Sequence, residues 1–301
     1  LPQYSSLYAK YAKMQHMKNH TYDVAIIGGG PAGMMAAISA AKNCNSVIII
    51  EKNEKLGKKL LITGGGRCNV TNATTDNRIL AEKYGKKGKF LLSPLSQWNV
   101  LSTINFFESR GMPTKTEDGG RVFPLSNRSQ SVLDVLITEL KKHNVEILTK
   151  YSVTKVLHTK ETITGIETTN GIIYAKSYIV ATGGTARPET GSSGEGFSWL
   201  KKLGHKIIIP EPALVPIKIL EPWVMKLQGL ALSAVKITYF ENNIRREAKI
   251  GKILFTHFGL SGPLILNMSR TIGEAMKESV VVLSLDIFPS DDHTILDEKL
   301  L

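Results

Sequence analysis

The segment GGGPAG is the part of the sequence whose residue types and spacing most directly indicate chemistry. Its glycines at positions 28, 30 and 33 have the spacing G-x-G-x-x-G, which is typical of loops that hold a pyrophosphate. Gly28 permits a tight turn, Gly30 leaves room for a phosphate beside the backbone, and Gly33 allows a helix to pack closely against a strand. Pro31 and Ala32 stand just before the helix predicted from Met34, and the free N–H groups at a helix start attract negative charge. The segment predicts a nucleotide phosphate site.

An acidic residue, Glu51, stands eighteen residues after Gly33, where a ribose-binding carboxylate belongs. It ends the second of two short apolar runs, residues 22–27 and 46–51, which predict parallel strands around a helix over residues 34–42. Its carboxylate can accept both hydrogen bonds of a ribose diol and would repel a 2′-phosphate, which argues against NADP. The fingerprint does not separate FAD, NAD and a simple nucleotide, and an ordinary glycine-rich turn is the structural alternative.

Two further glycine-rich loops extend this prediction. One contains Gly64, Gly65, Gly66 and Arg67, and the other is Ala181-Thr182-Gly183-Gly184 at the end of a predicted strand. Backbone without side chains can approach a flat or charged ligand closely. Three such loops in one α/β domain suit a long dinucleotide, although each could be a structural turn.

Three other side chains could take part in chemistry, but each has a structural alternative. Cys68 is either a redox thiol or, as we favour, a packed and inert one. His257 could act as a base or make a structural hydrogen bond, and Arg67 could hold an anionic group or pair with an acid. We therefore assign no catalytic residue. The seven histidines show no ligand spacing, so no metal site is expected.

The composition predicts a globular protein of two domains. The chain has 301 residues, of which 42% are hydrophobic and 21% charged. Its two cysteines cannot build a disulfide framework, which favours the reducing cytoplasm. Residues 24–41 carry no charge, but the glycines and proline among them indicate a turn rather than a membrane span. No signal peptide is recognisable in residues 1–20.

The formal net charge of +12 raises the question of nucleic-acid binding. The excess comes from lysines spread along the chain, while arginine, the preferred reader of phosphate and guanine, is scarce at nine residues. No RNA-binding or helix-turn-helix signature accompanies the charge. A lysine-rich solvated surface is therefore the favoured interpretation, and a nucleic-acid partner is not expected.

The remaining elements must position these loops. Helices are predicted over residues 97–110 and 129–142, the second with Ser129 as its N-cap, and a parallel strand over residues 145–148. Residues 151–157, 162–168 and 171–175 predict an antiparallel meander, followed by a separate buried strand at residues 178–184. Residues 54–75 show no period of either kind.

A cluster of prolines at positions 210, 212, 216 and 222 predicts a domain boundary. We expect an N-terminal tail over residues 1–20, a nucleotide-binding domain over residues 21–209 and a β-rich domain over residues 210–301. Within the last, residues 235–240, 249–255 and 280–288 predict strands, and residues 263–276 a helix. A further helix would begin after Ser290, so the chain is expected to be cut short.

The motifs together resemble a known family. The strand, glycine loop and Glu51-Lys52 resemble the two-dinucleotide-binding-domain flavoproteins. The segments LGKKL, TGGGRCNVTN, GRVFP, ATGG and FTHFGLSGP are similar to those of HI0933-like flavoproteins, which include aminoacetone oxidase and BaiN-type proteins. The resemblance covers about residues 21–301. It implies a Rossmann-like α/β FAD domain with an inserted β-rich second domain.

The resemblance also implies a function and a set of contacts. It implies an FAD-dependent oxidoreductase that takes a hydride from a small reduced substrate, such as an amine like aminoacetone, and passes electrons to oxygen or another acceptor. Lys59 and the loop from Thr63 to Asn69 would follow the ribityl chain and ring, and Val153 would meet adenine through its backbone. The expected cofactor-binding residues are Gly28, Gly30, Pro31, Ala32, Gly33, Glu51, Lys52, Lys59, Thr63, Gly64, Gly65, Gly66, Arg67, Cys68, Asn69, Val153, Ala181, Thr182, Gly183 and Gly184.

The resemblance fails at one place. Family members return to the FAD domain after the inserted domain with a glycine-rich strand and helix, and no segment here matches them. We therefore expect a chain ending at residue 301 to hold FAD more weakly than an extended one. The alternatives are an NAD-dependent dehydrogenase, a non-catalytic flavin- or RNA-binding protein, and an inactive fragment.

Overall fold

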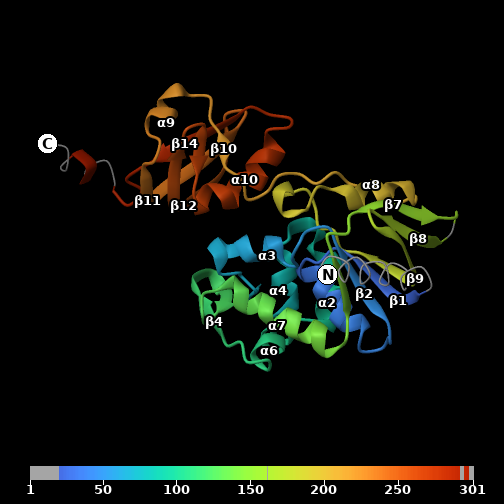
Figure 1. The fold of residues 1–301 in the computed structure, drawn as a ribbon. Helices are drawn as coiled ribbons and strands as arrows, with labels where there is room; N and C mark the ends of the chain where they lie inside the picture. Colours follow the sequence, from blue (N-terminus) through green and yellow to red (C-terminus); the bar gives the residue numbers. More distant parts are fainter. Residues whose placement is uncertain (1–19, 161, 292–294, 298–301) are drawn as a thin grey trace, which may run out of the picture. The chain divides into compact units, whose positions relative to one another are not determined.

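The computed structural model of the protein describes residues 20–160, 162–291 and 295–297. It divides into two compact units, the first ending at Ile208 and the second beginning at Ile209. Each is described by itself (Figure 1). The tail expected over residues 1–20 lies outside the described residues except for His20, and so does most of the helix expected after Ser290.

A six-stranded sheet in the order β6-β2-β1-β9-β8-β7 forms the centre of the first unit. Its strands are β1 (Thr21–Ile27), β2 (Val47–Glu51), β6 (Glu146–Thr149), β7 (Val153–His158), β8 (Ile163–Thr168) and β9 (Gly171–Val180). β1 runs parallel to both β2 and β9, and Ile27 pairs with Ile50 and with Val180. The carboxyl ends of three parallel strands therefore meet at one edge, which brings the turn after β1, Glu51 and the loop after β9 together.

The expected separation of the meander from the last core strand is wrong, because β9 is one continuous strand. Its first residues pair antiparallel with β8, from Gly171 to Ile173, and from Tyr174 onward it pairs parallel with β1. The polar residues Lys176 and Ser177, which interrupt the apolar pattern, do not interrupt the backbone pairing. The meander is therefore a direct extension of the central sheet.

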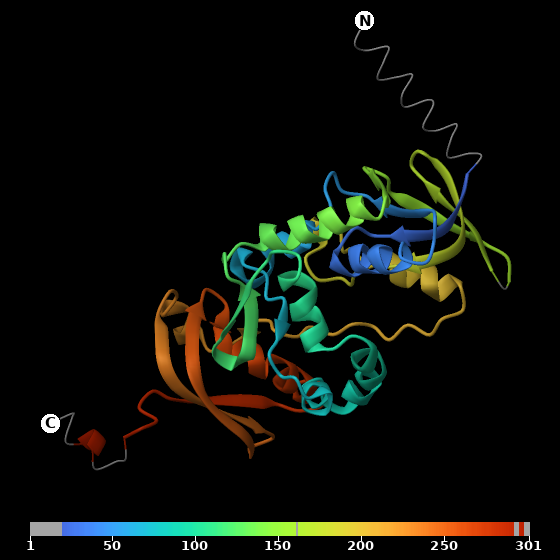
Figure 2. The same ribbon diagram turned by 90° about the horizontal axis from the view of Figure 1, so that it is seen from below.

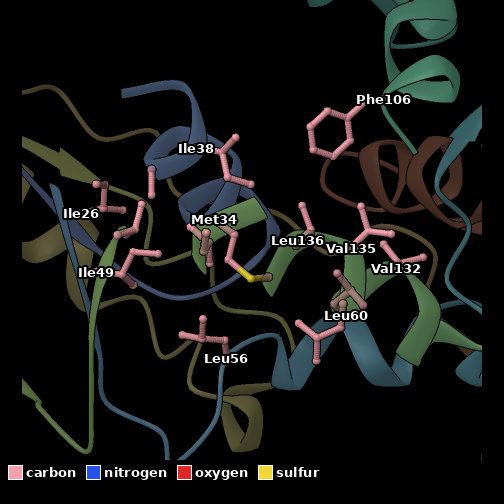
Figure 3. Packing of buried hydrophobic residues seen from close by; sticks show 14 of the residues in the cluster. Ile26, Met34, Ile38, Ile49, Leu56, Leu60, Phe106, Val132, Val135 and Leu136 are labelled. Carbon is pink, nitrogen blue, oxygen red and sulfur yellow. The ribbon is translucent and has the colours of Figure 1, made fainter. Parts of the chain in front are cut away.

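Helices cover one face of this sheet. α2 (Pro31–Ala40) and α7 (Ser129–Lys142) pack their apolar sides against β1 and β2. Figure 3 shows Met34 and Ile38 of α2 between Ile26 and Ile49 of the sheet and Leu136 of α7. Burying side chains of this size contributes about 1.5–3 kcal/mol each, which fixes α2 and hence the glycine turn before it.

On the other side of β1 and β2 lies a second cluster of buried side chains, to which β7, β8 and α8 (Glu195–Lys202) contribute. Figure 1 shows α8 and the meander on this side. The cluster joins Val156 and Ile166 of the meander and Trp199 of α8 with Ile48 and Ile50 of β2. Both faces are thus buried, which explains why the parallel strands are continuous apolar runs. The loop after β9 contains the short helix η4 (Pro188–Thr190) and leads to α8.

The chain between β2 and α7 forms short elements. They are α3 (Lys58–Ile62), η1 (Thr63–Gly66), β3 (Thr71–Asn72), α4 (Asn77–Glu82), η2 (Gly85–Leu91), α5 (Leu92–Gln97), α6 (Val100–Glu108), β4 (Thr114–Glu117), η3 (Asp118–Gly120) and β5 (Arg121–Pro124). The helix expected over residues 97–110 is thus α6 alone, capped by the Asn99 side chain. Ser129 is not an N-cap, because it lies inside α7 and its hydroxyl donates to the Leu61 carbonyl.

The second unit is a five-stranded sheet with one long helix. Its sheet order is β10-β13-β12-β11-β14, and α10 packs on it with Ile265 and Met268 in the core. Its elements are β10 (Ile217–Lys218), α9 (Pro222–Lys226), β11 (Ala231–Glu241), β12 (Ile244–Thr256), β13 (Gly259–Ser261), α10 (Pro263–Ala275) and β14 (Val281–Asp286). None of the helices in the described part of the chain has the length and apolar character that a membrane crossing requires.

Candidate functional site

The turn after β1 is built so that two of its glycines cannot be replaced. Gly28 has φ +110°, and a Cβ there would lie 2.5 Å from the Ala181 carbonyl oxygen. A Cβ on Gly33 would lie 1.9 Å from the Gly28 carbonyl oxygen. These contacts join the turn to α2 on one side and to the end of β9 on the other. The geometric reasons given for both glycines by the sequence pattern therefore hold.

Gly30 is different, because a side chain there would meet open space. It is the N-cap of α2 with an extended backbone, and no heavy atom lies within 4 Å of an ideal Cβ. No side chain caps α2, so the first-turn N–H groups of Ala32 and Gly33 are left to an external acceptor. The helix dipole adds a partial positive charge at this point. Space, donors and charge together fit a phosphate.

Glu51 is buried behind this turn and has a structural task that the sequence did not indicate. Its Oε2 accepts from the Gly29 N–H at 2.7 Å, and its Oε1 accepts from the backbone N–H and the side-chain amide of Asn53, both at 2.7 Å. A carboxylate offers about four acceptor positions, so roughly one remains free. One ribose hydroxyl could bind without rearrangement, whereas the expected pair would have to displace an Asn53 donor.

The loop after β9 is fastened to the loop after β2 by side chains from both. The Asn53 amide donates to the Thr190 carbonyl at 3.0 Å, and the Lys52 ammonium donates to Ser193 and pairs with Glu195 at 2.8 Å. Lys59 donates to the Ala186 carbonyl at 2.6 Å. Two of the expected cofactor ligands, Lys52 and Lys59, therefore hold the protein itself at this edge of the sheet.

A cavity of about 280 Å³ opens at the edge formed by these loops. Eleven of the expected site residues line it: Gly28, Gly30, Pro31, Ala32, Glu51, Lys52, Lys59, Val153, Ala181, Thr182 and Gly183. The lining also includes residues that were not expected, among them Gly29, Asn53, Tyr151, Thr190, Gly191, Ser192, Glu195 and Trp199. The glycine- and serine-rich run TGSSGEG, residues 190–196, could have indicated several of these as a further loop at the site. No sequence pattern indicated Tyr151 or Trp199.

A second cavity of about 340 Å³ shares Pro31 and Lys59 with the first. The expected residues Thr63, Cys68 and Asn69 line it. Most of its wall is apolar and is formed by Met35, Leu60, Val70, Trp98, Phe106, Phe107, Val132 and Leu136. The two cavities therefore offer adjoining spaces, one next to the glycine turn after β1 and one with a mostly apolar wall.

Six expected residues line neither cavity. Gly33 lies within α2, and Gly184 follows the lining residues of the β9 loop. Gly64, Gly65 and Gly66 have φ values of +56°, +66° and +83°. They determine the shape of the TGGGRCN loop but do not line the second cavity. Left-handed backbone of this kind favours glycine, so the conformation explains the run without a ligand.

Arg67, the sixth, pairs with an acid. Its Nη1 donates to both carboxylate oxygens of Glu117 at 3.0 and 3.1 Å, and its guanidinium lies 4.0 Å from the centre of the Phe123 ring. The hydrogen bonds from Lys115 and then Arg67 lower the pKa of Glu117. Of the two alternatives for Arg67, an anionic ligand or an acidic side chain of the protein, the structure shows the acidic side chain.

Cys68 and His257 have different surroundings. Burial raises the pKa of the Cys68 thiol, so at neutral pH it is protonated and a poor nucleophile. His257 is exposed in the second unit, with its ring against Phe258. Within the described residues, no three His, Cys, Asp or Glu side chains come together as metal ligands.

Comparison with known proteins places the chain in a family. A model described as the HI0933-like protein Rossmann domain matches residues 22–273, which is most of the chain. The chain belongs to the HI0933-like family. This HI0933-like chain is 33% identical to a 3-dehydro-bile acid delta(4,6)-reductase of Clostridium scindens, over 85% of its own length and 61% of the relative's. It is 30% identical to a ribosomal RNA dihydrouridine synthase of Escherichia coli, over 92% of its own length and 67% of the relative's.

The HI0933-like chain thus spans about three fifths to two thirds of the length of these relatives. Among solved structures, the open conformation of a flavocytochrome c3 fumarate reductase matches with a TM-score of 0.55 and 20% identity, over 74% of this chain and 49% of that one. The likeness establishes the Rossmann-like α/β fold of the first unit.

Proposed function

We propose that this chain binds FAD across the two adjoining cavities and is the cofactor-binding part of an FAD-dependent oxidoreductase. The observation that carries the proposal is the open space at Gly30, which lies at the uncapped start of α2. Gly30 lines the first cavity, and its neighbour Pro31 lines both cavities. Family membership and the reductase among its relatives support it.

The residues of the first cavity would hold the adenosine and pyrophosphate. Gly30 leaves room for phosphate, and the N–H groups of Ala32 and Gly33 donate to it. Glu51 presents its remaining acceptor position to the ribose, and the first residue of β7, Val153, borders the space for adenine.

The second cavity would hold the ring. When bound, FAD supplies hydride transfer between a substrate and an acceptor. The apolar wall, with Trp98 and Phe106, would exclude water from the ring, and the protonated thiol of Cys68 would lie beside it without reacting. An NAD-dependent dehydrogenase is less well supported, because the single ring of nicotinamide would cover less of this apolar wall than the three fused rings of a flavin.

The proposal has a direct test. The purified chain is mixed with FAD, passed over a desalting column, and its absorbance is read near 450 nm, where oxidised flavin absorbs. We expect retained flavin in the wild-type chain and little in Gly30→Val, whose side chain would enter the phosphate space. NADH retained in place of flavin would overturn the FAD assignment in favour of the dehydrogenase.

The direction of the reaction is a finer part of the proposal. Oxidation of a small amine such as aminoacetone, with oxygen as acceptor, would appear as substrate-dependent oxygen consumption. Reduction of a carbon–carbon double bond would instead consume a reductant, and the names of both relatives describe reductions. We propose the reductive direction. Oxygen uptake with aminoacetone and no turnover of an unsaturated substrate would contradict it.

A second candidate substrate is uridine in ribosomal RNA. The specific observations are the 30% identity to a ribosomal RNA dihydrouridine synthase over 92% of this chain and the net charge of +12. Incubation of unmodified ribosomal RNA with the FAD-loaded chain and a reductant, followed by mass spectrometry for dihydrouridine, tests it. An absence of dihydrouridine together with turnover of small unsaturated substrates would exclude this candidate.

A further inference from the structure

Residues 77–98 form a helical excursion of the first unit that is rich in cations and exposed rings. They comprise α4, η2, α5 and Trp98, and they contain five Lys or Arg residues against the single acid Glu82. The Phe90 side chain is 82% exposed and that of Tyr84 is 56% exposed. Two aromatic rings this exposed within six residues of sequence are available for contact with a partner.

The positive charge of the excursion is not neutralised locally. In the part of the chain that the structure describes, Arg78, Lys83, Lys87 and Lys89 form no ion pair with a carboxylate. The Lys83 ammonium donates only to uncharged oxygens, those of Asn72 and Thr74. The cations are therefore available to an anionic partner.

The excursion is ordered by its own contacts. The Asp76 carboxylate accepts from the N–H groups of Arg78 and Ile79 at the start of α4, and the Asn77 amide donates to the Leu95 carbonyl of α5. η2 packs so closely on α4 that a Cβ on Gly88 would lie 1.8 Å from the Ala81 carbonyl oxygen. Tight packing thus holds the exposed rings outward. Figure 2 shows these short helices, coloured cyan to teal, apart from the core sheet of the unit.

Trp98 connects the excursion to the second cavity. It follows α5 directly, lines the cavity, and contacts Phe106 edge to face with the ring centres 5.7 Å apart. It is also 40% exposed, so its ring belongs both to the cavity wall and to the outer surface. A polymer lying along the excursion would therefore reach the cavity at Trp98.

We infer that the excursion is a binding surface for single-stranded RNA. This inference rests on ribosomal RNA as the substrate, the second candidate above, and specifies where the RNA would lie. Bases stack on exposed aromatic rings, and phosphates are attracted to unpaired lysines between them. Phe90 and Tyr84 supply the rings, and Lys87 and Lys89 lie in the segment that joins them. An acidic peptide would match the charge but would leave the rings without a stacking partner.

The test measures binding of a fluorescein-labelled poly(U) of about twenty nucleotides by anisotropy, with the FAD-loaded chain. We expect Lys87→Glu/Lys89→Glu to weaken binding by about tenfold or more and to reduce its salt dependence. Phe90→Ala should weaken it by about tenfold through lost stacking. The matched control is Lys201→Glu/Lys202→Glu, an exposed pair on α8 that changes net charge equally and should alter affinity by less than about threefold.

Three outcomes would overturn the inference. The first is an equal loss of poly(U) affinity in the two double variants, because binding would then depend on net charge alone. The second is competition by poly-glutamate as strong as that by unlabelled poly(U). The third is tighter binding to anionic phospholipid vesicles than to poly(U). Retained flavin absorbance is recorded for each variant and should not change. If the wild-type chain retains no flavin but binds poly(U), the proposed function is refuted and the RNA-binding surface is supported. If it retains flavin but does not bind poly(U), the RNA-binding surface is refuted and FAD binding is supported.

Discussion

At the scale of single residues, Gly30 and Gly33 have opposite surroundings although both belong to one fingerprint. An alanine at position 30 meets nothing in the protein, whereas an alanine at position 33 would collide with the Gly28 carbonyl. We expect Gly30→Ala to change the free energy of unfolding by less than about 1 kcal/mol and to weaken FAD binding by about tenfold. Gly33→Ala should lower the free energy of unfolding by about 3 kcal/mol.

Urea unfolding and fluorescence titration with FAD measure the two effects. Each variant is the control for the other, because both add the same methyl group within one turn of chain. An FAD affinity of Gly30→Ala equal to that of the wild type would show that no phosphate lies at this position.

Glu51 is a second residue whose substitution separates stability from ligand binding. Glutamine keeps its size but replaces one acceptor oxygen by a donor, which leaves the N–H of Gly29 or a donor of Asn53 without a partner. A buried unpaired donor costs about 1–3 kcal/mol, so Glu51→Gln should unfold at lower urea concentration even without FAD. Glu54→Gln is the control, because Glu54 is exposed and its one ion pair among the described residues is with Lys150. Equal unfolding midpoints for the two variants would contradict this role of Glu51.

At the scale of elements, the helices α6 and α7 are joined by an ion pair at the end of α6. Arg110 Nη2 lies 2.8 Å from Glu139 Oε2, and Glu139 is buried with Lys142 and His143 also facing it. The hydrogen bond from Arg110 is the main cause that lowers the pKa of Glu139 in the folded protein. A lowered pKa stabilises the fold above the ordinary pKa of the group, and this contribution is lost as the pH falls through the folded value.

We therefore expect the free energy of unfolding to fall as the pH drops below the ordinary glutamate pKa of about 4.3, in part through Glu139. In Glu139→Gln the acid-side slope should be smaller, while stability at neutral pH should be lower by about 3 kcal/mol because Arg110 loses its partner. Urea unfolding as a function of pH provides the measurement. Parallel pH profiles for the variant and the wild type would exclude Glu139 as a contributor.

At the scale of the whole molecule, every residue that lines the two cavities belongs to the first unit. A chain that ends at Ile208 should therefore bind ADP, which carries the adenosine and pyrophosphate of FAD, with an affinity within about threefold of the 301-residue chain. Isothermal titration of both chains is the test, and Gly30→Ala should weaken ADP binding equally in each. A loss of more than about tenfold in the short chain would show that the second unit contributes to this site.

Sequence patterns predicted the parts of the fold that depend on neighbouring residues. The strand–glycine turn–helix unit, α7 and most of the second unit's strands follow from apolar periodicity, because a buried face imposes its period on the chain. The backbone roles predicted for Gly28 and Gly33 agree with the structure for the same reason, since a tight turn and a close helix–strand contact are local demands, whereas their contact with a cofactor stays a prediction. The family followed from short motifs whose order along the chain is specific.

Only the tertiary structure determined the features that depend on contacts between residues far apart in the sequence. The continuity of β9 through Lys176 and Ser177 depends on its alignment with β1, which no local pattern contains. The internal bonds of Glu51 and Lys59 and the pairing of Arg67 with Glu117 depend on loops far apart in sequence. A residue type indicates which bonds a side chain can make, but which partner it meets depends on how the sheet aligns the strand ends.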